Sequence, residues 1–232
     1  MILLFAPAKS FILDKPMVGQ PNLSKETEKL IKNLSKLALH EIEKRFKVSP
    51  LLAKDVLAYY KHFDLNPSFR AIDLYHGESY KSLDISTLTS FDESFLQEHL
   101  LIIDALYGLI RPLDLIKPYR LDFTIAGLNL HTLWKPLFES QFKDQTEPIL
   151  SLASDEFTSK IKQIKAVYEV HFIDCKNGVC KAISVFNKQQ RGALLRHIVK
   201  NRIERLDDLP TSFNGYHLKR NGYNLQYIKS ID

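Results

Sequence analysis

Cationic side chains recur every four residues within the segment FNKQQRGALLRHIVKNRIERL, residues 186–206. Lys188, Gly192, Arg196 and Lys200 fall on one face of the helix that the apolar spacing predicts. Like charges at this spacing cost an isolated helix about 0.2–0.5 kcal/mol per pair, which a bound anion would offset. The face therefore predicts an anion-binding surface. The alternative is a solvated basic face on which Gly192 allows another element to come close.

The segment LYGLIRPLDLIKPYRLD, residues 106–122, also combines cations with apolar residues. The residues before it predict a helix from about Glu93 to Tyr107, with Asp92 as its N-cap. Gly108 ends that helix, and the arginine-proline step that follows cannot readily continue it. The outline resembles a helix-hairpin-helix element, which holds a phosphate with hairpin amides and a basic side chain.

Arg111 and Arg120 are the cations that such an element would direct at a phosphate. The match is incomplete, because the glycine pair common in those hairpins is missing from the sequence and Pro118 shortens any second helix. A buried structural loop, with the arginines paired to Asp114 or Asp122, is the alternative interpretation.

Polar residues also follow two predicted strands. Lys9 comes after the strand at 2–5, and Ser154 and Glu156 follow the strand at 149–153. Side chains beyond strand ends often line a cleft in sheet-based folds. Lys9 is a candidate anion anchor, nucleophile or base. For each of these residues taken alone, a surface salt bridge is the favoured interpretation.

Cys175 and Cys180 flank the sequence KNGV, in which Asn-Gly is a strong signal for a two-residue hairpin turn. Such a turn places the cysteines opposite each other, near enough to bridge or to share a metal. In the cytosol we expect two thiols on a strand pair. The eight histidines show no ligand spacing, and no metal or cofactor signature occurs in the sequence.

Composition indicates an ordinary globular protein, with 45% hydrophobic and 25% charged residues. No apolar run approaches the roughly 20 residues of a membrane span, and the opening residues do not form a signal peptide, so a cytoplasmic location is expected. The net charge of +5 is uneven. Residues 181–232 carry ten Lys/Arg and four Asp/Glu, a balance of +6, which leaves 22 and 23 in residues 1–180. This asymmetry favours a polyanion or phosphate partner.

Hydrophobic periodicity predicts helices and strands mixed along the chain. We therefore expect an α+β fold, a single domain over 1–232, with a mixed sheet surrounded by helices. Helices are predicted at 24–46, 50–63, 93–107, 132–142 and 188–205, with another starting at 154–156. Strands are predicted at 2–5, 71–75, 149–153, 166–174, 179–186, 215–218 and 225–228.

Several motifs together resemble the YaaA family of bacterial peroxide-stress proteins. They are PAK at 7–9, LYGLIRPLDLIKPYRL at 106–121, LASDEF at 152–157, FNKQQRGALLRHIVKNRI at 186–203 and FNGY at 213–216. The resemblance implies a cytosolic protein that limits unincorporated iron during hydrogen peroxide stress. It also implies binding of duplex or distorted DNA through a positive cleft. Motif and charge together suggest these cleft residues: Lys9, Arg111, Tyr119, Arg120, Ser154, Glu156, Lys188, Arg191, Arg196, Lys200 and Asn201.

Two functions are therefore weighed, the first as the leading hypothesis and the second as its rival. In the first, the chain is a DNA-binding stress protein whose phosphate contacts give shallow sequence preference and steep salt dependence. In the second, the same cleft belongs to an enzyme acting on a small anionic substrate, such as a nucleotide, with Lys9 or Glu156 performing the chemistry. A deep pocket around Lys9 would favour the enzyme, and an open groove would favour nucleic acid. Direct iron binding has no support in the residue spacing.

Overall fold

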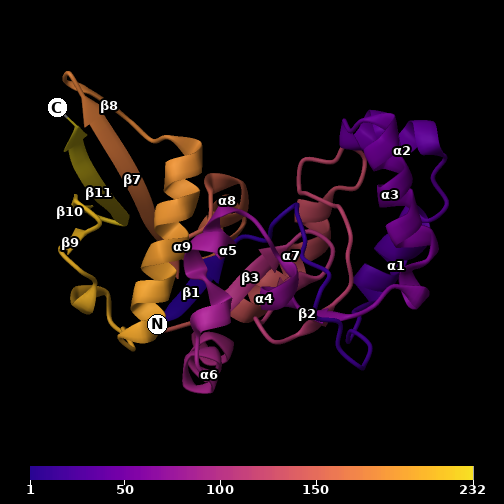
Figure 1. Ribbon diagram of the computed structural model, residues 1–232, viewed down its shortest axis with the longest axis horizontal. Coiled ribbons are helices and arrows are strands. Elements are labelled where there is room, and N and C mark those ends of the chain that lie inside the picture. Colours follow the sequence, from indigo (N-terminus) through magenta and orange to yellow (C-terminus); the bar gives the residue numbers. More distant parts are fainter. Residues whose placement is uncertain (232) are drawn as a thin grey trace.

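A mixed β-sheet forms the centre of the computed structural model, which describes residues 1–231 (Figure 1). Within these residues the sheet has nine strands, in the order β4-β3-β1-β6-β7-β11-β10-β9, with β8 paired to β7. The inner strands β3, β1, β6, β7 and β11 run parallel to one another. The predicted α+β class and mixed sheet are confirmed. The strands are β1 (Ile2–Phe5), β3 (Leu100–Asp104), β4 (Gly108–Ile110), β6 (Ile149–Ser151), β7 (Tyr168–Lys176), β8 (Val179–Lys181), β9 (Ser212–Phe213), β10 (Tyr216–Asn221) and β11 (Asn224–Ile231).

The helices lie around this sheet and beyond one end of it. Helices α1, α2 and α3 gather at one end of the long axis of the molecule, and β7, β10 and β11 lie at the other (Figure 1). No helix in residues 1–231 is long and apolar enough to cross a membrane. The helices are α1 (Lys25–Leu34), α2 (Leu39–Phe46), α3 (Pro50–Lys61), α4 (Ala71–Leu74), α5 (Glu78–Leu83), α6 (Ser90–His99), α7 (Leu130–Phe142), α8 (Asp155–Lys162) and α9 (Ser184–Lys200).

Strand β3 corrects the predicted helix at 93–107. Helix α6 ends at His99, and the next five residues form a fully buried strand. Consecutive apolar residues fit a parallel strand covered on both faces, and spacing alone does not separate such a strand from a buried helix. The N-cap is Thr89, since Asp92 occupies the third helical position, where its carboxylate accepts the Thr89 N–H at 2.8 Å.

The helix-hairpin-helix-like element is not confirmed, because strand β3 occupies the place of its first helix. The chain turns after β3, where the Asp104 carboxylate accepts the N–H groups of Leu106 and Tyr107 at 2.7 and 2.9 Å. It then returns antiparallel as β4, which Gly108 opens with a φ of +81°. A short strand β5 (Leu115–Ile116) follows.

Three more predicted elements are wrong in type or extent for local reasons. The predicted strand at 71–75 is helix α4, preceded by strand β2 (Phe69–Arg70), which pairs with β5 in a small second sheet. The segment 71–75 has too few buried apolar residues for their spacing to distinguish one helical turn from a strand. The predicted helix at 24–46 is two helices with a break between Leu34 and Leu39, and Ser24 is the N-cap of the first. The strand predicted at 179–186 ends at Lys181, because helix α9 starts at Ser184.

The predicted Asn177-Gly178 hairpin is confirmed, but the prediction of two free thiols is not. Both turn residues have positive φ, +51° and +77°, and Cys175 is paired directly with Cys180. The structure joins them as a disulfide with Cα atoms 4.0 Å apart. The physical reason is the register, because a two-residue turn places these residues at a non-hydrogen-bonded pair, where the side chains come closest.

Candidate functional site

The centre of the sheet contains a point at which the strand order reverses. Strand β1 lies between β3 and β6 in the sheet. Along the chain, β1 is followed in this sheet by β3, its neighbour on one side, whereas β6, its neighbour on the other side, is followed by β7, which lies still farther from β1 on that side. The connections therefore leave β1 and β6 in opposite directions and open a crevice at their carboxyl ends. A cavity of about 470 Å³ lies there, lined by the segments that follow both strands.

Four segments build the walls of this cavity, which we call the crevice pocket. They are residues 5–10 after β1, residues 76–81 at the start of α5, residues 119–122, and residues 152–157 after β6. Lys188 and Arg191 of α9 complete it. Apolar side chains such as Phe5, Leu121 and Phe157 lie among the charged ones, so the pocket offers both kinds of contact.

Lys9 and Asp122 form an ion pair at the pocket, with the Lys9 Nζ 2.8 Å from a carboxylate oxygen of Asp122. The aspartate side chain is 14% exposed and the lysine side chain 58%. Burial raises the pKa of Asp122, but the hydrogen bonds from Lys9 and Thr124 outweigh it and lower the pKa below its ordinary value. Asp122 is therefore ionised at neutral pH, and Lys9 compensates its charge.

Glu156 differs from Asp122 in having no compensating contact. It lies in the first turn of α8, and its Oε1 atom is shielded from solvent without a hydrogen-bond partner in the described residues. Burial and the neighbouring Asp122 raise the pKa of Glu156, against the opposing effect of Lys9, Lys160 and Lys188. A shielded carboxyl group with a raised pKa is suited to exchange a proton with a bound molecule.

The segment 117–122 is fixed to the core by alternate residues. The buried ammonium of Lys117 donates to the carbonyls of Phe63 and Asp64 at 3.0 and 2.9 Å. Two residues on, the Tyr119 hydroxyl donates to the buried carboxylate of Asp104. These anchors hold residue 120, and its carbonyl accepts the Tyr60 hydroxyl at 2.7 Å.

The Arg120 side chain lines the pocket and makes no hydrogen bond to any group within residues 1–231. The hydroxyl of the preceding residue, Tyr119, has two partners, because besides its hydrogen bond to Asp104 it lies 3.1 Å from the Tyr75 hydroxyl. Tyr75 in turn donates to Asp104 at 2.6 Å. Burial, and then the charge of Asp104, raise the pKa of Tyr119 well above its ordinary value, so this wall of the pocket is a neutral hydroxyl.

Helix α9 contributes one buried and one exposed cation. The Arg191 side chain donates from Nε and Nη2 to the Val170 carbonyl of β7 at 3.0 and 2.8 Å. Arg191 is 8% exposed and lines the pocket. Lys188, one turn earlier, is exposed at the same pocket. Arg191 thus ties the helix to the sheet, and Lys188 is free for a ligand.

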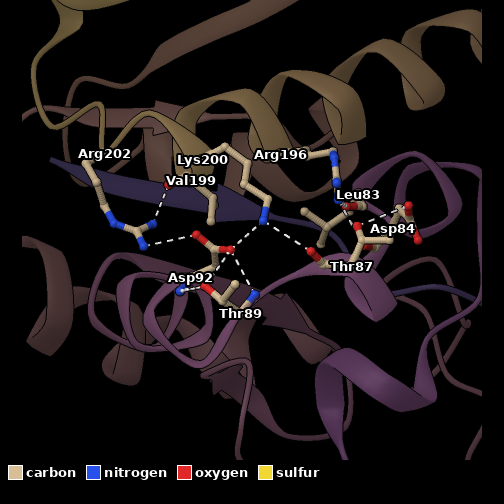
Figure 2. Close-up of polar contacts among 9 residues, drawn as sticks. All are labelled: Leu83, Asp84, Thr87, Thr89, Asp92, Arg196, Val199, Lys200 and Arg202. Atoms are coloured by element: carbon tan, nitrogen blue, oxygen red, sulfur yellow. Dashed lines mark hydrogen bonds and ion pairs between the residues drawn. The ribbon is translucent and has the colours of Figure 1, made fainter.

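The rest of the basic helix face contacts protein, as Figure 2 shows. The Asp92 carboxylate accepts Lys200 at 2.6 Å and Arg202 at 3.0 Å, and its side chain is 5% exposed. Arg196 donates to the carbonyls of Leu83 and Asp84 at 2.9 and 3.0 Å, at the carboxyl end of α5. These contacts join α9 to α5 and α6, so the repulsion expected among the cations is offset by carbonyls and an aspartate.

The predicted site residues therefore divide into two groups. Lys9, Tyr119, Arg120, Ser154, Glu156, Lys188 and Arg191 line the crevice pocket. Four lie elsewhere. Arg196 and Lys200 are in the contacts just described, Arg111 donates to the carbonyls of Gln97 and Glu98 at the end of α6, and Asn201 donates to the His197 carbonyl.

Sequence reasoning missed the whole wall at 76–81, including His76 and Glu78. The Glu78 carboxylate accepts Gln189 at 2.8 Å and Lys81 at 2.9 Å, which links α5 to α9 across the pocket rim. The sequence around these residues contains no charge pattern that separates them from an ordinary helix start. The missed Asp122 had a signal, since it ends the motif that supplies Arg120.

Fold and pocket together define an α+β protein that places charged side chains at the switch point of a largely parallel sheet. Comparison with known proteins then identifies the family. The family model described as "Peroxide stress protein YaaA" matches residues 1–222, and the chain belongs to this family. The predicted resemblance is thereby confirmed.

Two curated relatives are also similar over most of their length. A UPF0246 protein of Francisella philomiragia is 36% identical over 231 residues, which covers 90% of this chain and 91% of the relative. A UPF0246 protein of Francisella tularensis subsp. novicida is 35% identical over 232 residues, with the same coverage.

Proposed function

We propose that the crevice pocket binds a small anionic molecule and that Glu156 exchanges a proton with it. The observation that supports this proposal is the shielded, unpartnered Oε1 of Glu156 in a pocket with cations at its walls. Five cations line the pocket, Lys9, Lys81, Arg120, Lys188 and Arg191, against the three acids Glu78, Asp122 and Glu156, a balance of +2 with His76 neutral. This balance favours an anion.

The size of the pocket and the contacts of the neighbouring cations favour a small molecule over a polymer at this site. About 470 Å³ is within the range of roughly 300–1,000 Å³ typical of ligand pockets. A groove for DNA would need a continuous row of available cations. Arg196 and Lys200, which would extend the row along α9, are bonded to α5, α6 and their connection.

Thermal shift measurements with a panel of anions test the proposal. Inorganic phosphate, nucleotides and phosphorylated sugars are the probes, and we expect at least one to raise the melting temperature. Arg120→Ala and Lys188→Ala should each weaken that binding by about tenfold, the loss of one charge-assisted contact. Lys219→Ala on β10 is the matched control, because its exposed side chain is not part of the pocket. The proposal fails if no probe binds or if all three variants bind alike.

DNA binding is the second candidate, and a separate observation favours it. Lys181, Arg205 and Lys219 are exposed and form no ion pair within residues 1–231, and they belong to the basic last quarter of the chain. We infer that duplex or distorted DNA, if bound, contacts these residues. The family resemblance supports this candidate, together with a cytosolic role in limiting unincorporated iron.

The cellular role has its own test. In peroxide-treated bacteria that lack this protein, we expect unincorporated iron, measured by electron paramagnetic resonance of chelated whole cells, to rise above the level in the parent. Restoring the chain with Glu156→Gln separates the two roles. Full rescue by this variant would detach iron limitation from the proposed proton exchange, and failed rescue of a stably folded variant would link them.

A further inference from the structure

The hairpin that contains Cys175 and Cys180 lies outside the crevice pocket and suggests a chemistry of its own. The two cysteines are directly opposed in the β7–β8 register, with Cα atoms 4.0 Å apart. Cys180 is exposed and Cys175 half-buried, so solvent reaches the pair. Small solutes can therefore react with the sulfur atoms without any change in the fold.

The turn holds the two sulfur atoms together in the reduced protein as well. Asn177 and Gly178 adopt the positive φ values that a two-residue hairpin requires, and β7 is also paired with β11 along its length. The register therefore does not depend on the disulfide. A sulfur oxidised at one position has its partner thiol within reach, which makes the second step intramolecular.

We propose that Cys175 and Cys180 are a dithiol that hydroperoxides oxidise to the intramolecular disulfide. The thiolate of one cysteine attacks an oxygen of hydrogen peroxide, the O–O bond breaks, and hydroxide leaves and is protonated to water. The sulfenic acid sulfur is then attacked by the second thiolate, the S–S bond forms as the S–O bond breaks, and hydroxide leaves and is protonated to a second water. Two thiols are oxidised and one peroxide is reduced to two waters.

Exposure assigns the order of the two steps. Cys180 is the more exposed of the two residues and is the attacking residue, and Cys175 resolves the sulfenic acid. Lys176 and Lys181 directly follow Cys175 and Cys180 in the chain and are both exposed, so the hairpin around the pair carries positive charge. Asp174, the nearest acid, is buried, and one of its oxygens accepts the Tyr216 hydroxyl at 2.8 Å.

This chemistry does not rest on the crevice pocket, and the experiment keeps the two apart. The full chain is reduced, freed of reductant and mixed with one equivalent of hydrogen peroxide. We expect both thiols to be lost together with a mass decrease of about 2 Da, without dimers. Cys175→Ser should stop at the sulfenic acid of Cys180. A cyclic dione should label this variant at least about tenfold more than wild type, because the resolving step is missing.

Cys180→Ser is the matched variant and should react with peroxide several-fold more slowly than Cys175→Ser. Retained thiols, a disulfide between two chains, or equal dione labelling of wild type and Cys175→Ser would each overturn the proposal. Both serine variants should keep the anion-induced thermal shift of the wild type. If the wild type also shows no anion-induced thermal shift, this result would contradict the proposed anion binding in the crevice pocket and would leave the dithiol proposal unaffected.

Discussion

At the scale of single residues, Glu156 and Asp122 show how one pocket treats two carboxyl groups differently. Asp122 is ionised because Lys9 and Thr124 donate to it, whereas burial and the charge of Asp122 raise the pKa of Glu156. The pair resembles other sites in which neighbouring acids are tuned apart, one to hold charge and one to transfer a proton.

Binding of sulfate is expected to weaken as the pH rises. Glu156 gains its negative charge as the pH passes upward through its raised pKa, and the ionised group then repels a bound anion. Sulfate is the probe because its own charge is constant over this range. We expect affinity to fall about tenfold between pH 5 and pH 9, measured by calorimetry. Glu156→Gln should remove most of this dependence, and a variant that kept it in full would assign it to another group.

Asp92 is also a carboxyl group with a shifted pKa, but its role is structural. Burial raises its pKa, but hydrogen bonds from Lys200, Thr89 and Arg202 outweigh burial and hold the pKa well below 3.8. Ionised Asp92 therefore stabilises the folded state at pH values above 3.8, the pKa of this group in the unfolded chain. This contribution is lost as the pH falls through the lower pKa of Asp92 in the folded protein. Asp92→Asn should lower the free energy of unfolding at pH 7 by about 2 kcal/mol.

Urea titrations at pH 7 and pH 3 check this prediction. Because wild-type Asp92 begins to lose its contribution as the pH falls below 3.8, the deficit of Asp92→Asn should be smaller at pH 3 than at pH 7. A deficit of constant size at both pH values would mean that packing, and not the charge of Asp92, stabilises the contact among α6 and α9 (Figure 2). Glu204→Gln is a control, since that residue is exposed and has no ion pair in the described residues.

At the scale of elements, the contact between α5 and α9 decides where the basic face points. A Cβ added at Gly192 would lie 2.0 Å from the Ser79 carbonyl oxygen. This distance is far inside a van der Waals contact, and the obstacle is backbone, which cannot rotate away. The glycine in the cationic series therefore allows the close approach of another element, one of the interpretations that its sequence position had suggested.

Gly192→Ala should accordingly destabilise the protein in spite of the better helix propensity of alanine. We expect a loss of about 1–3 kcal/mol in the free energy of unfolding, the cost of overpacking, measured by chemical denaturation. Ala193→Gly, at the next position of the same helix, should lose only about 1 kcal/mol, the ordinary propensity cost. If Gly192→Ala is instead stabilised by about 1 kcal/mol, then α5 can move away and the close packing has no energetic importance.

Local signals predicted many elements, and failed where tertiary context decides. The serine caps at Ser24 and Ser49 and the Asn177-Gly178 turn depend on neighbouring residues alone, and each was predictable. Strand β3 was not, because its apolar run fits a buried helix as well as a strand. The sequence correctly places the cations on one face of α9. Which of them remain available to a ligand depends on the contacts that α9 makes with α5 and α6, and the sequence of α9 alone does not predict those contacts.

The candidate site shows the same division. Residues directly after β1 and β6 could be assigned to one cleft, because carboxyl ends of parallel strands meet at one edge of a sheet. Arg120 and Arg111 occur in one motif, yet the first lines the pocket and the second caps α6. The difference arises from anchors such as Tyr119 on Asp104, which pair residues distant in sequence and leave no local signature.

At the scale of the whole molecule, positive charge is available on two sets of residues. Arg120 and Lys188 line the walls of the crevice pocket, whereas Lys181, Arg205 and Lys219 are exposed outside it, before α9, after α9 and on β10. The net charge of +5 does not distinguish between them. A small anion needs only the first, whereas a duplex, with one charge per about 1.7 Å, has to contact cations over a wider area.

The salt dependence of DNA binding separates these two sets. If duplex DNA contacts Lys181, Arg205 and Lys219, replacing all three by alanine should reduce the slope of log affinity against log salt by about 2.7, since each phosphate contact contributes about 0.9. The loss should be alike for all sequences, measured by fluorescence anisotropy between low and moderate salt. The double variant Arg120→Ala, Lys188→Ala should leave that slope unchanged while it abolishes the anion-induced thermal shift. If the double variant alone lowers the slope, the crevice pocket itself meets the DNA backbone, and the small-anion proposal loses its main distinction.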